Sequence, residues 1–142
     1  MKKKFEQLSI KQGFIKHNGG LLFREISKTE YEFKTTICKK HLNASNITHG
    51  GYIASIIDAG AGTGAHRAAG NVPCVTISLD IKFMGITKLG DEISGFVKIQ
   101  KKTKTLVFLI CYLQVNKKII GSASGVWKIL NSKPIPKSGF GG

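Results

Sequence analysis

A histidine and two glycines precede an aspartate at a spacing that could support catalysis. His49, Gly50 and Gly51 stand where a loop leads into a predicted helix, and Asp58 follows inside that helix. The first backbone N–H groups of a helix have no partner within it, and they lie at its positive end. Glycine lets a ligand approach the backbone closely. This corner could therefore stabilise the oxyanion of an attacked carbonyl or hold a phosphate.

Asp58 differs from the other acidic residues because its sequence neighbours, residues 55–57 and 59–61, are apolar or small. Burying an unpaired carboxylate in such surroundings is costly, and an ionisable group kept there is often functional. Two structural alternatives stay open. Asp58 could face solvent on an amphipathic helix, or it could pair with a lysine of a neighbouring strand.

The helix that carries Asp58 is predicted from composition and from the absence of alternation. Residues 51–69 are rich in alanine and isoleucine, but they include Gly60, Gly62 and Gly64. Each glycine costs up to ~1 kcal/mol relative to alanine in a helix interior. Close approach of a sheet or a ligand would explain these glycines, and a helix that ends near Gly60 is the alternative.

Alternating apolar and polar residues predict strands around this helix. The clearest strand is Val75 to Phe83, and further strands are expected over residues 21–26, 31–38, 92–101, 105–115 and 118–130. The short connections after residues 101 and 115 predict that the last three form an antiparallel meander. A short helix is expected over residues 5–15, followed by a turn at 17–20.

These elements predict one α+β domain over residues 1–131, of which residues 1–19 form the N-terminal helix and turn. A curved antiparallel sheet of about six strands must bury one face against the central helix. Residues 132–142 contain two prolines and three glycines without apolar periodicity, so we expect a flexible tail.

The formal charge of +14 could attract nucleic acid, an anionic membrane or a phosphate-bearing ligand. Only Arg24 and Arg67 are arginines among the 22 basic residues, and the lysines spread along the whole chain. We therefore expect no nucleic-acid partner. The longest apolar run, residues 106–113, is far shorter than the ~20 residues that span a bilayer, so no membrane partner is expected either.

Three cysteines without a CxxC pair indicate a reducing, cytoplasmic setting. Cys38, His41 and His49 superficially suggest metal ligands, but no second close-spaced pair completes a tetrahedral set. We expect neither a metal nor a cofactor. There is no GxSxG elbow for a serine hydrolase.

The segment from Asn43 to Gly51, followed by Asp58, resembles the Asn-x-x-Gly-x-x-His-Gly-Gly-x6-Asp signature of PaaI-type hotdog thioesterases. The spacing matches at every fixed point except one, where Asn46 replaces glycine. Asparagine tolerates a left-handed backbone better than most residues, so the loop can keep its shape. The resemblance extends through residues 75–81 and 104–108 and covers roughly residues 20 to 130.

This resemblance implies a hotdog fold in which two subunits join their sheets and build active sites at the interface. It also implies a homodimer or a dimer of dimers that hydrolyses acyl-CoA. By position, Asp58 would be the general base or nucleophile, and the Gly50 N–H would polarise the carbonyl. Asn43 and His49 would support the carbonyl or the attacking water. Ser78 would position that water, across the interface if its strand neighbours pack on their own helix.

Substrate binding is expected at the Gly51 backbone and at Lys101, Lys102 and Lys104, whose turn could contact the phosphates of CoA. A solvated hairpin tip is the structural alternative for these lysines. Two other functions remain open: a noncatalytic acyl-CoA-binding hotdog protein, and a hotdog dehydratase or hydratase acting on acyl chains.

Overall fold

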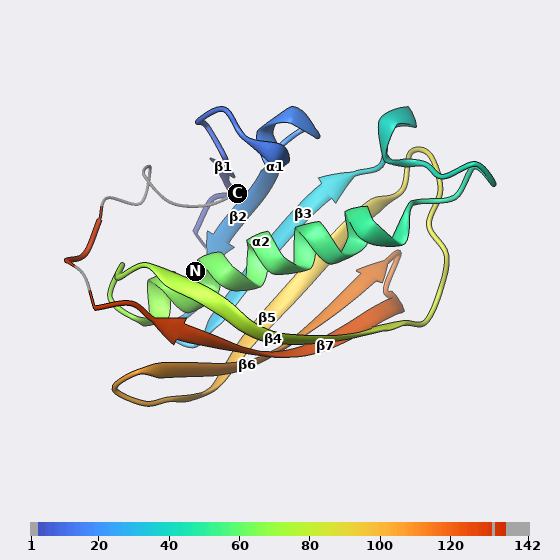
Figure 1. Cartoon of the computed structure of the whole chain (residues 1–142). Coiled ribbons are helices and arrows are strands. Elements are labelled where there is room, and N and C mark those ends of the chain that lie inside the picture. The colour runs from blue at the N-terminus through green and yellow to red at the C-terminus, as the bar shows by residue number, and fades with distance from the viewer. Residues whose placement is uncertain (1–2, 132, 136–142) are drawn as a thin grey trace.

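One long helix lies across one face of a curved antiparallel sheet in the computed structural model, which describes residues 3–131 and 133–135 (Figure 1). The predicted α+β architecture is confirmed. The helix is α2 (Gly50–Ala68). The strands of the described chain are β1 (Glu6–Leu8), β2 (Leu21–Glu25), β3 (Glu30–Thr36), β4 (Cys74–Phe83), β5 (Glu92–Lys102), β6 (Leu106–Val115) and β7 (Lys118–Ile129).

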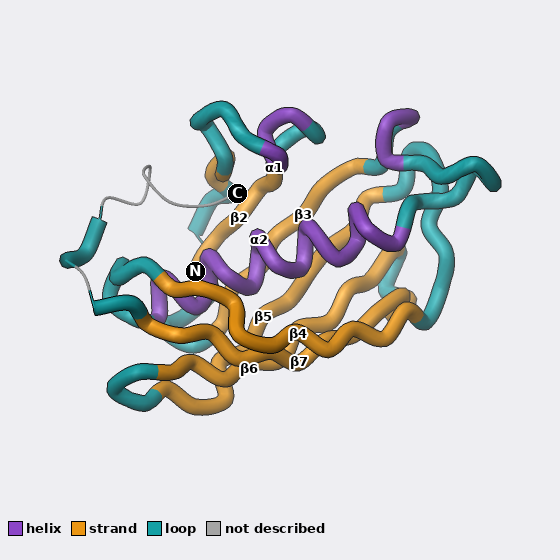
Figure 2. The backbone as a smooth tube through the Cα atoms, viewed as in Figure 1, coloured by secondary structure: helices purple, strands orange, loops and turns teal. Residues whose placement is uncertain are grey.

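The strands form one sheet (Figure 2) in the order β1-β2-β3-β5-β6-β7-β4. Each neighbouring pair is antiparallel. β5, β6 and β7 form the predicted meander. β4, the first strand after α2 in the chain, lies at one edge of the sheet and pairs with β7. Within the described residues, the other side of β4 has no partner strand, so its backbone groups are open to another chain.

The helix predicted over residues 5–15 is wrong. Glu6–Leu8 form strand β1, which pairs with β2, and only Phe14–His17 form the short helix α1. Leu8 and Ile15 are both buried, but they belong to different elements. Backbone pairing with β2 outweighs the weak local preference for a helix.

Two further expectations concern the end of the chain and the membrane. The flexible tail predicted for residues 132–142 falls mainly outside the described residues, although the Ile135 N–H donates to the Asn71 carbonyl at 2.9 Å. Within the described chain, no helix combines the length and the apolar character that crossing a bilayer requires.

The glycines of α2 mark where the helix packs most closely on the sheet. A Cβ on Gly60 would lie 2.3 Å from the Phe33 ring, and one on Gly64 would lie 3.2 Å from the Tyr31 ring. The helix continues past Gly60 to Ala68, so the early-ending alternative is wrong. These glycines lower helix propensity but let the helix approach the buried aromatic rings of β3.

The core fills the space between α2 and the inner face of the sheet. Phe33, Leu109 and Trp127 point into it and are almost fully buried. Alternate residues point the other way, and Ile110 and Tyr112 on β6 are exposed on the outer face.

Candidate active site

The loop before α2 is shaped by the side chain of Asn43. Its Oδ1 accepts hydrogen bonds from the backbone N–H groups of Ser45, at 2.9 Å, and Ile47, at 3.3 Å. Asn46 has a φ of 60°, in the left-handed region, so the expectation that asparagine serves here in place of glycine is confirmed. Asn43 therefore has a structural role in the loop, whatever it does toward a ligand.

The same loop is tied to the segment that follows β4. The Thr48 N–H donates to the Thr87 carbonyl at 2.9 Å, and the Thr87 hydroxyl donates to the Thr48 hydroxyl at 2.6 Å. Both threonines are buried. Next to this junction, the Phe83 ring lies close to Gly50, because a Cβ added there would be 3.6 Å from a ring carbon. The first turn of α2 therefore lies at the Phe83 end of β4.

His49 caps the N-terminus of α2. Its Nδ1 accepts a hydrogen bond from the Gly51 N–H at 2.8 Å. A Cβ on Gly51 would lie 2.9 Å from that nitrogen, so glycine permits the cap. The Gly51 N–H is thus already bonded to the protein, whereas Gly50 is exposed and its N–H has no intrahelical acceptor. Gly50 is the better candidate to meet a ligand oxygen.

Cys38 and His41, which resemble metal ligands in the sequence, contact each other at 3.5 Å from Sγ to Nδ1. Both His41 ring nitrogens have other partners: Nδ1 accepts from the Cys38 N–H at 3.1 Å, and Nε2 donates to the Asn18 carbonyl at 2.6 Å. The ring also stacks on Tyr52, with centroids 3.8 Å apart. No group of three or more His, Cys, Asp or Glu side chains in the described chain could hold a metal ion.

Asp58 is exposed in the single chain, so the burial that its sequence neighbours suggested is not found there. Its Oδ1 accepts a hydrogen bond from Oγ1 of Thr76 at 2.6 Å. None of the salt bridges within residues 3–131 and 133–135 involves Asp58, so its partner on the strand is a hydroxyl rather than a lysine. The sequence pattern gives no sign that Thr76 meets Asp58.

A β-bulge in β4 explains why Thr76 meets Asp58. Thr76 pairs with Trp127 and Ser78 pairs with Val126, which leaves Ile77 as the extra residue. Since adjacent residues on β7 point to opposite faces, Thr76 shares the inner face with Trp127, and Ser78 lies on the outer face. Ser78 is therefore remote from Asp58 of its own chain, and its predicted role across an interface stays a prediction.

The predicted site residues do not meet in one chain. Gly50 and Asp58 are eight residues apart on the same helix, which is about 12 Å along its axis.

Burial raises the pKa of the Cys74 thiol to about 11, and the nearby Lys102 opposes that rise. Lys102 pairs with Val107, which is in register with Trp127 and Thr76, so Lys102 lies at the Cys74 end of the sheet. That end is about 30 Å along β4 from Phe83 and Gly50.

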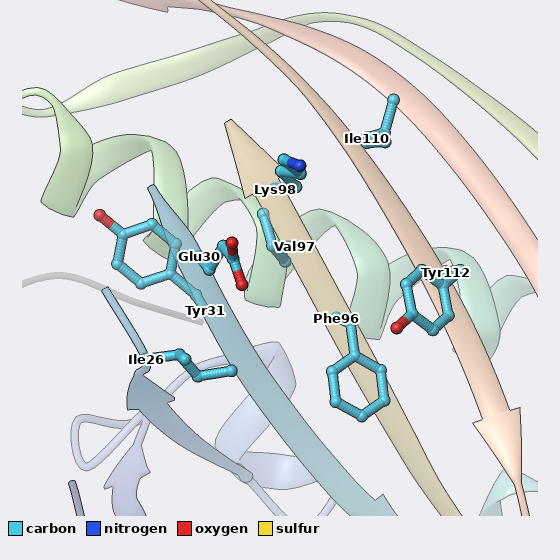
Figure 3. A pocket seen from close by; sticks show the side chains of 8 residues that line it. All are labelled: Ile26, Glu30, Tyr31, Phe96, Val97, Lys98, Ile110 and Tyr112. Atoms are coloured by element: carbon cyan, nitrogen blue, oxygen red, sulfur yellow. The ribbon is translucent and has the colours of Figure 1, made fainter. Parts of the chain in front are cut away.

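A cavity of about 190 Å³ lies elsewhere, on the sheet formed by β3, β5 and β6 (Figure 3). Phe96 and Tyr112 lie side by side there, with ring centroids 5.0 Å apart. None of the predicted site residues lines this cavity.

Part of the chain matches a known protein family. Residues 45–111 match the family model of the thioesterase superfamily. A candidate esterase from Pseudomonas aeruginosa is 26% identical over 112 residues, which cover 78% of this chain and 84% of that protein. The family match includes His49, Gly50, Asp58 and Thr76, but it begins after Asn43.

Solved structures share the fold. Zebra fish thioesterase superfamily member 2 has a TM-score of 0.77 and 20% identity, over 85% of this chain and 89% of that one. The Escherichia coli PaaI protein of the phenylacetic acid degradation operon has a TM-score of 0.75 and 14% identity, over 81% and 83%. A Streptococcus mutans protein bound to acetyl-CoA has a TM-score of 0.70 and 19% identity, over 94% and 93%.

The resemblance found in the sequence is confirmed: residues 45–111 match the thioesterase superfamily, and the chain has the hotdog fold.

Proposed function

We propose that this protein hydrolyses acyl-CoA thioesters, with Asp58 as the general base or nucleophile. The observation that carries the proposal is the pair of Asp58 and Thr76, an exposed carboxylate fixed by a 2.6 Å hydrogen bond beside the free edge of β4. A carboxylate without a cationic partner is available to take a proton from water or to attack a carbonyl. The thioester is a suitable substrate because sulfur gives its carbonyl little resonance and the thiolate leaves readily.

The Gly50 N–H would polarise the thioester carbonyl from the positive end of α2. His49 and Asn43 would hold the cap and the loop that present this group. Because the Nδ1 atom of His49 accepts the Gly51 N–H, the neutral ring carries its proton on Nε2, which could donate to the same carbonyl or to a water. Gly51 would act by donating its N–H to His49 Nδ1, so this N–H would not itself contact the substrate.

A complete site would require a second copy of the chain, because Gly50 and Asp58 of one chain are too far apart to meet one carbonyl. Val75 and Ile77 on the free edge of β4 are 45% and 57% exposed. If two β4 strands pair antiparallel about a two-fold axis, the Phe83 end of one lies beside the Cys74 end of the other. Gly50 would then approach Asp58 and Thr76 of the partner subunit.

The same arrangement would bring the lysine turn to the substrate. Lys101 and Lys102 end strand β5 at the Cys74 end of the sheet, and Lys104 follows in the β5–β6 turn. All three lysines are exposed. They would therefore approach the partner's Gly50, at the site where a bound CoA would need cations for its phosphates. The acetyl-CoA bound to the Streptococcus mutans protein supports a CoA ligand.

The test is Asp58→Asn, which keeps the size of the side chain but removes the charge. Loss of a general base lowers kcat by roughly 10²–10⁴-fold, and loss of a nucleophile could lower it further. Binding of a nonhydrolysable acyl-CoA analogue should survive. Glu30→Gln, an exposed change on β3, is the matched control and should retain wild-type turnover.

A correctly folded and assembled Asp58→Asn protein that turns over its best acyl-CoA within a few-fold of the wild type would reject the catalytic role. If neither protein hydrolyses any acyl-CoA but both bind one, the noncatalytic binding function replaces this proposal. A panel of short, medium, long and aromatic acyl groups would cover the substrates that the sequence leaves open.

A further inference from the structure

An exposed surface around α1 combines apolar side chains with lysines. Ile10 and Phe14 are 53% and 61% exposed, although the neighbouring Ile15 is buried. Lys11 and Lys16 are exposed on the same segment. The Lys16 Nζ donates to the Ile10 carbonyl at 2.8 Å, so this lysine lies against the loop that carries Ile10.

The turn at Lys39–His41 extends this surface. The Lys40 Nζ donates to the His17 carbonyl at 2.8 Å, and the His41 ring contacts the Asn18 carbonyl at 2.6 Å, so the turn lies beside α1. In Figure 1, α1 and the turn that follows β3 project on the same side of the molecule. We call the exposed side chains of this region the amphipathic surface. They are Ile10, Lys11, Phe14, Lys16, Lys39 and Lys40.

The charge of the amphipathic surface is of one sign. Residues 9–24 and 33–57 contain no aspartate or glutamate. Glu92 is an acidic side chain at its border, in a cavity that Lys34 and His41 also line. Exposed apolar side chains among lysines match a lipid bilayer, whose anionic headgroups cover a hydrocarbon layer.

We propose that the amphipathic surface docks on the surface of an anionic lipid bilayer. Ile10 and Phe14 would enter the boundary between headgroups and acyl chains, and the lysines would contact the anionic headgroups. Each lysine near such a bilayer should raise the partition coefficient of the protein onto the bilayer by about fivefold. The sequence-based expectation of no membrane partner rested on the absence of a spanning segment, which surface docking does not need.

This surface stays free in the dimer proposed above. It adjoins β1 and β2, at the opposite edge of the sheet from β4. It also lies near the start of α2, since His41 stacks on Tyr52 of the first helical turns. Lipid docking would place the proposed site beside a bilayer, but the lipid contact itself does not depend on catalysis.

The first experiment measures co-sedimentation of the full chain with vesicles of phosphatidylcholine alone or mixed equally with phosphatidylglycerol. Binding is expected only to the mixed vesicles, and raising the salt concentration should release it because lysine–headgroup attraction is screened. Equal binding to both vesicle types, or no binding to either, overturns the proposal.

Two double variants test whether vesicle binding depends on the lysines of this surface or only on the net positive charge of the chain. Lys11→Gln combined with Lys39→Gln should weaken partitioning by about 25-fold, from about fivefold for each lysine. Lys28→Gln combined with Lys98→Gln removes the same charge from exposed positions outside the surface and should change binding little. Equal losses in both pairs would reject a specific docking surface.

The apolar contact is tested by fluorescence. Trp127 is the only tryptophan of the chain and is buried, so Phe14→Trp adds a reporter whose emission shifts to the blue only if that side chain enters the bilayer. Phe14→Ser should weaken binding, whereas Ile110→Ser on the outer face of the sheet should not. If Phe14→Ser instead lowers the oligomeric state in light scattering, the surface joins copies of the chain and the lipid proposal fails.

Discussion

Thr76 donates a hydrogen bond from Oγ1 to Oδ1 of Asp58 over 2.6 Å, and this contact joins the edge strand β4 to the middle of α2. It lies on the inner face of the sheet because the bulge at Ile77 changes the register of β4 against β7. A hydroxyl that donates to one carboxylate oxygen fixes the rotamer and leaves the second oxygen available. This geometry supports the proposed role of Asp58, as a base toward water or as a nucleophile toward the thioester carbonyl.

Thr76→Val should lower kcat without a comparable change in KM. The substitution keeps the shape of the side chain but removes the donor to Asp58. Hydrogen bonds to charged groups contribute about 1.5–3 kcal/mol, so the expected loss in kcat is roughly 10–100-fold. Thr76→Ser, which restores the hydroxyl, should recover most of the rate. Steady-state kinetics on one acyl-CoA substrate measures both, and a fully active Thr76→Val variant would show that the contact is only structural.

Ile77→Glu should dissociate the proposed dimer into monomers. Ile77 is 57% exposed on the free edge of β4, where a carboxylate would be costly to bury between two copies. In the proposed dimer each site takes Gly50 and Asp58 from different subunits, so kcat should fall by more than about 100-fold, as expected for a lost oxyanion donor. Light scattering and kinetics at matched concentrations test this. Ile110→Glu on the outer face should produce no monomer, and an active monomer of either variant would contradict the shared site.

Replacing Lys101, Lys102 and Lys104 together by alanine should raise KM for acyl-CoA. One lost charge-assisted contact corresponds to about tenfold in affinity, and several should cost more. A short thioester without the nucleotide is the internal control, because it has no phosphates for these lysines to bind. Equal changes in KM for both substrates would mean that the turn is a solvated hairpin tip.

Gly60→Ala should destabilise the fold, although alanine is the better helix former. The new Cβ would lie 2.3 Å from the Phe33 ring, and overpacking of this kind costs about 1–3 kcal/mol. The gain in helix propensity, about 1 kcal/mol, offsets only part of that cost. Urea denaturation should show a lower free energy of unfolding. Gly13→Ala, where a Cβ meets nothing within 4 Å, is the control. A stabilised Gly60→Ala protein would contradict the packing argument.

The sequence determined the central helix, six of the strands and the loop that begins α2. These features follow from local patterns: alternation over Val75 to Phe83, an unbroken helical segment at residues 51–69, and an asparagine at position 46 that adopts the left-handed backbone. The family signature around His49, Gly50 and Asp58 is also a local pattern, because its residues lie close together in the sequence. It pointed to the thioesterase superfamily, whose family model matches residues 45–111, and to the hotdog fold that the structure shows.

Only the tertiary structure decided which strand residue reaches Asp58, and how far apart the parts of the site lie. The bulge at Ile77 is a mismatch between two paired strands, so alternation within β4 alone could not place Thr76 rather than Ser78 toward the helix. Likewise, β1 forms because its backbone pairs with β2, a strand that lies outside the short stretch of sequence that predicts local structure. The exposure of Asp58 depends on β4 standing at the sheet edge, which strand order sets and residue pattern does not.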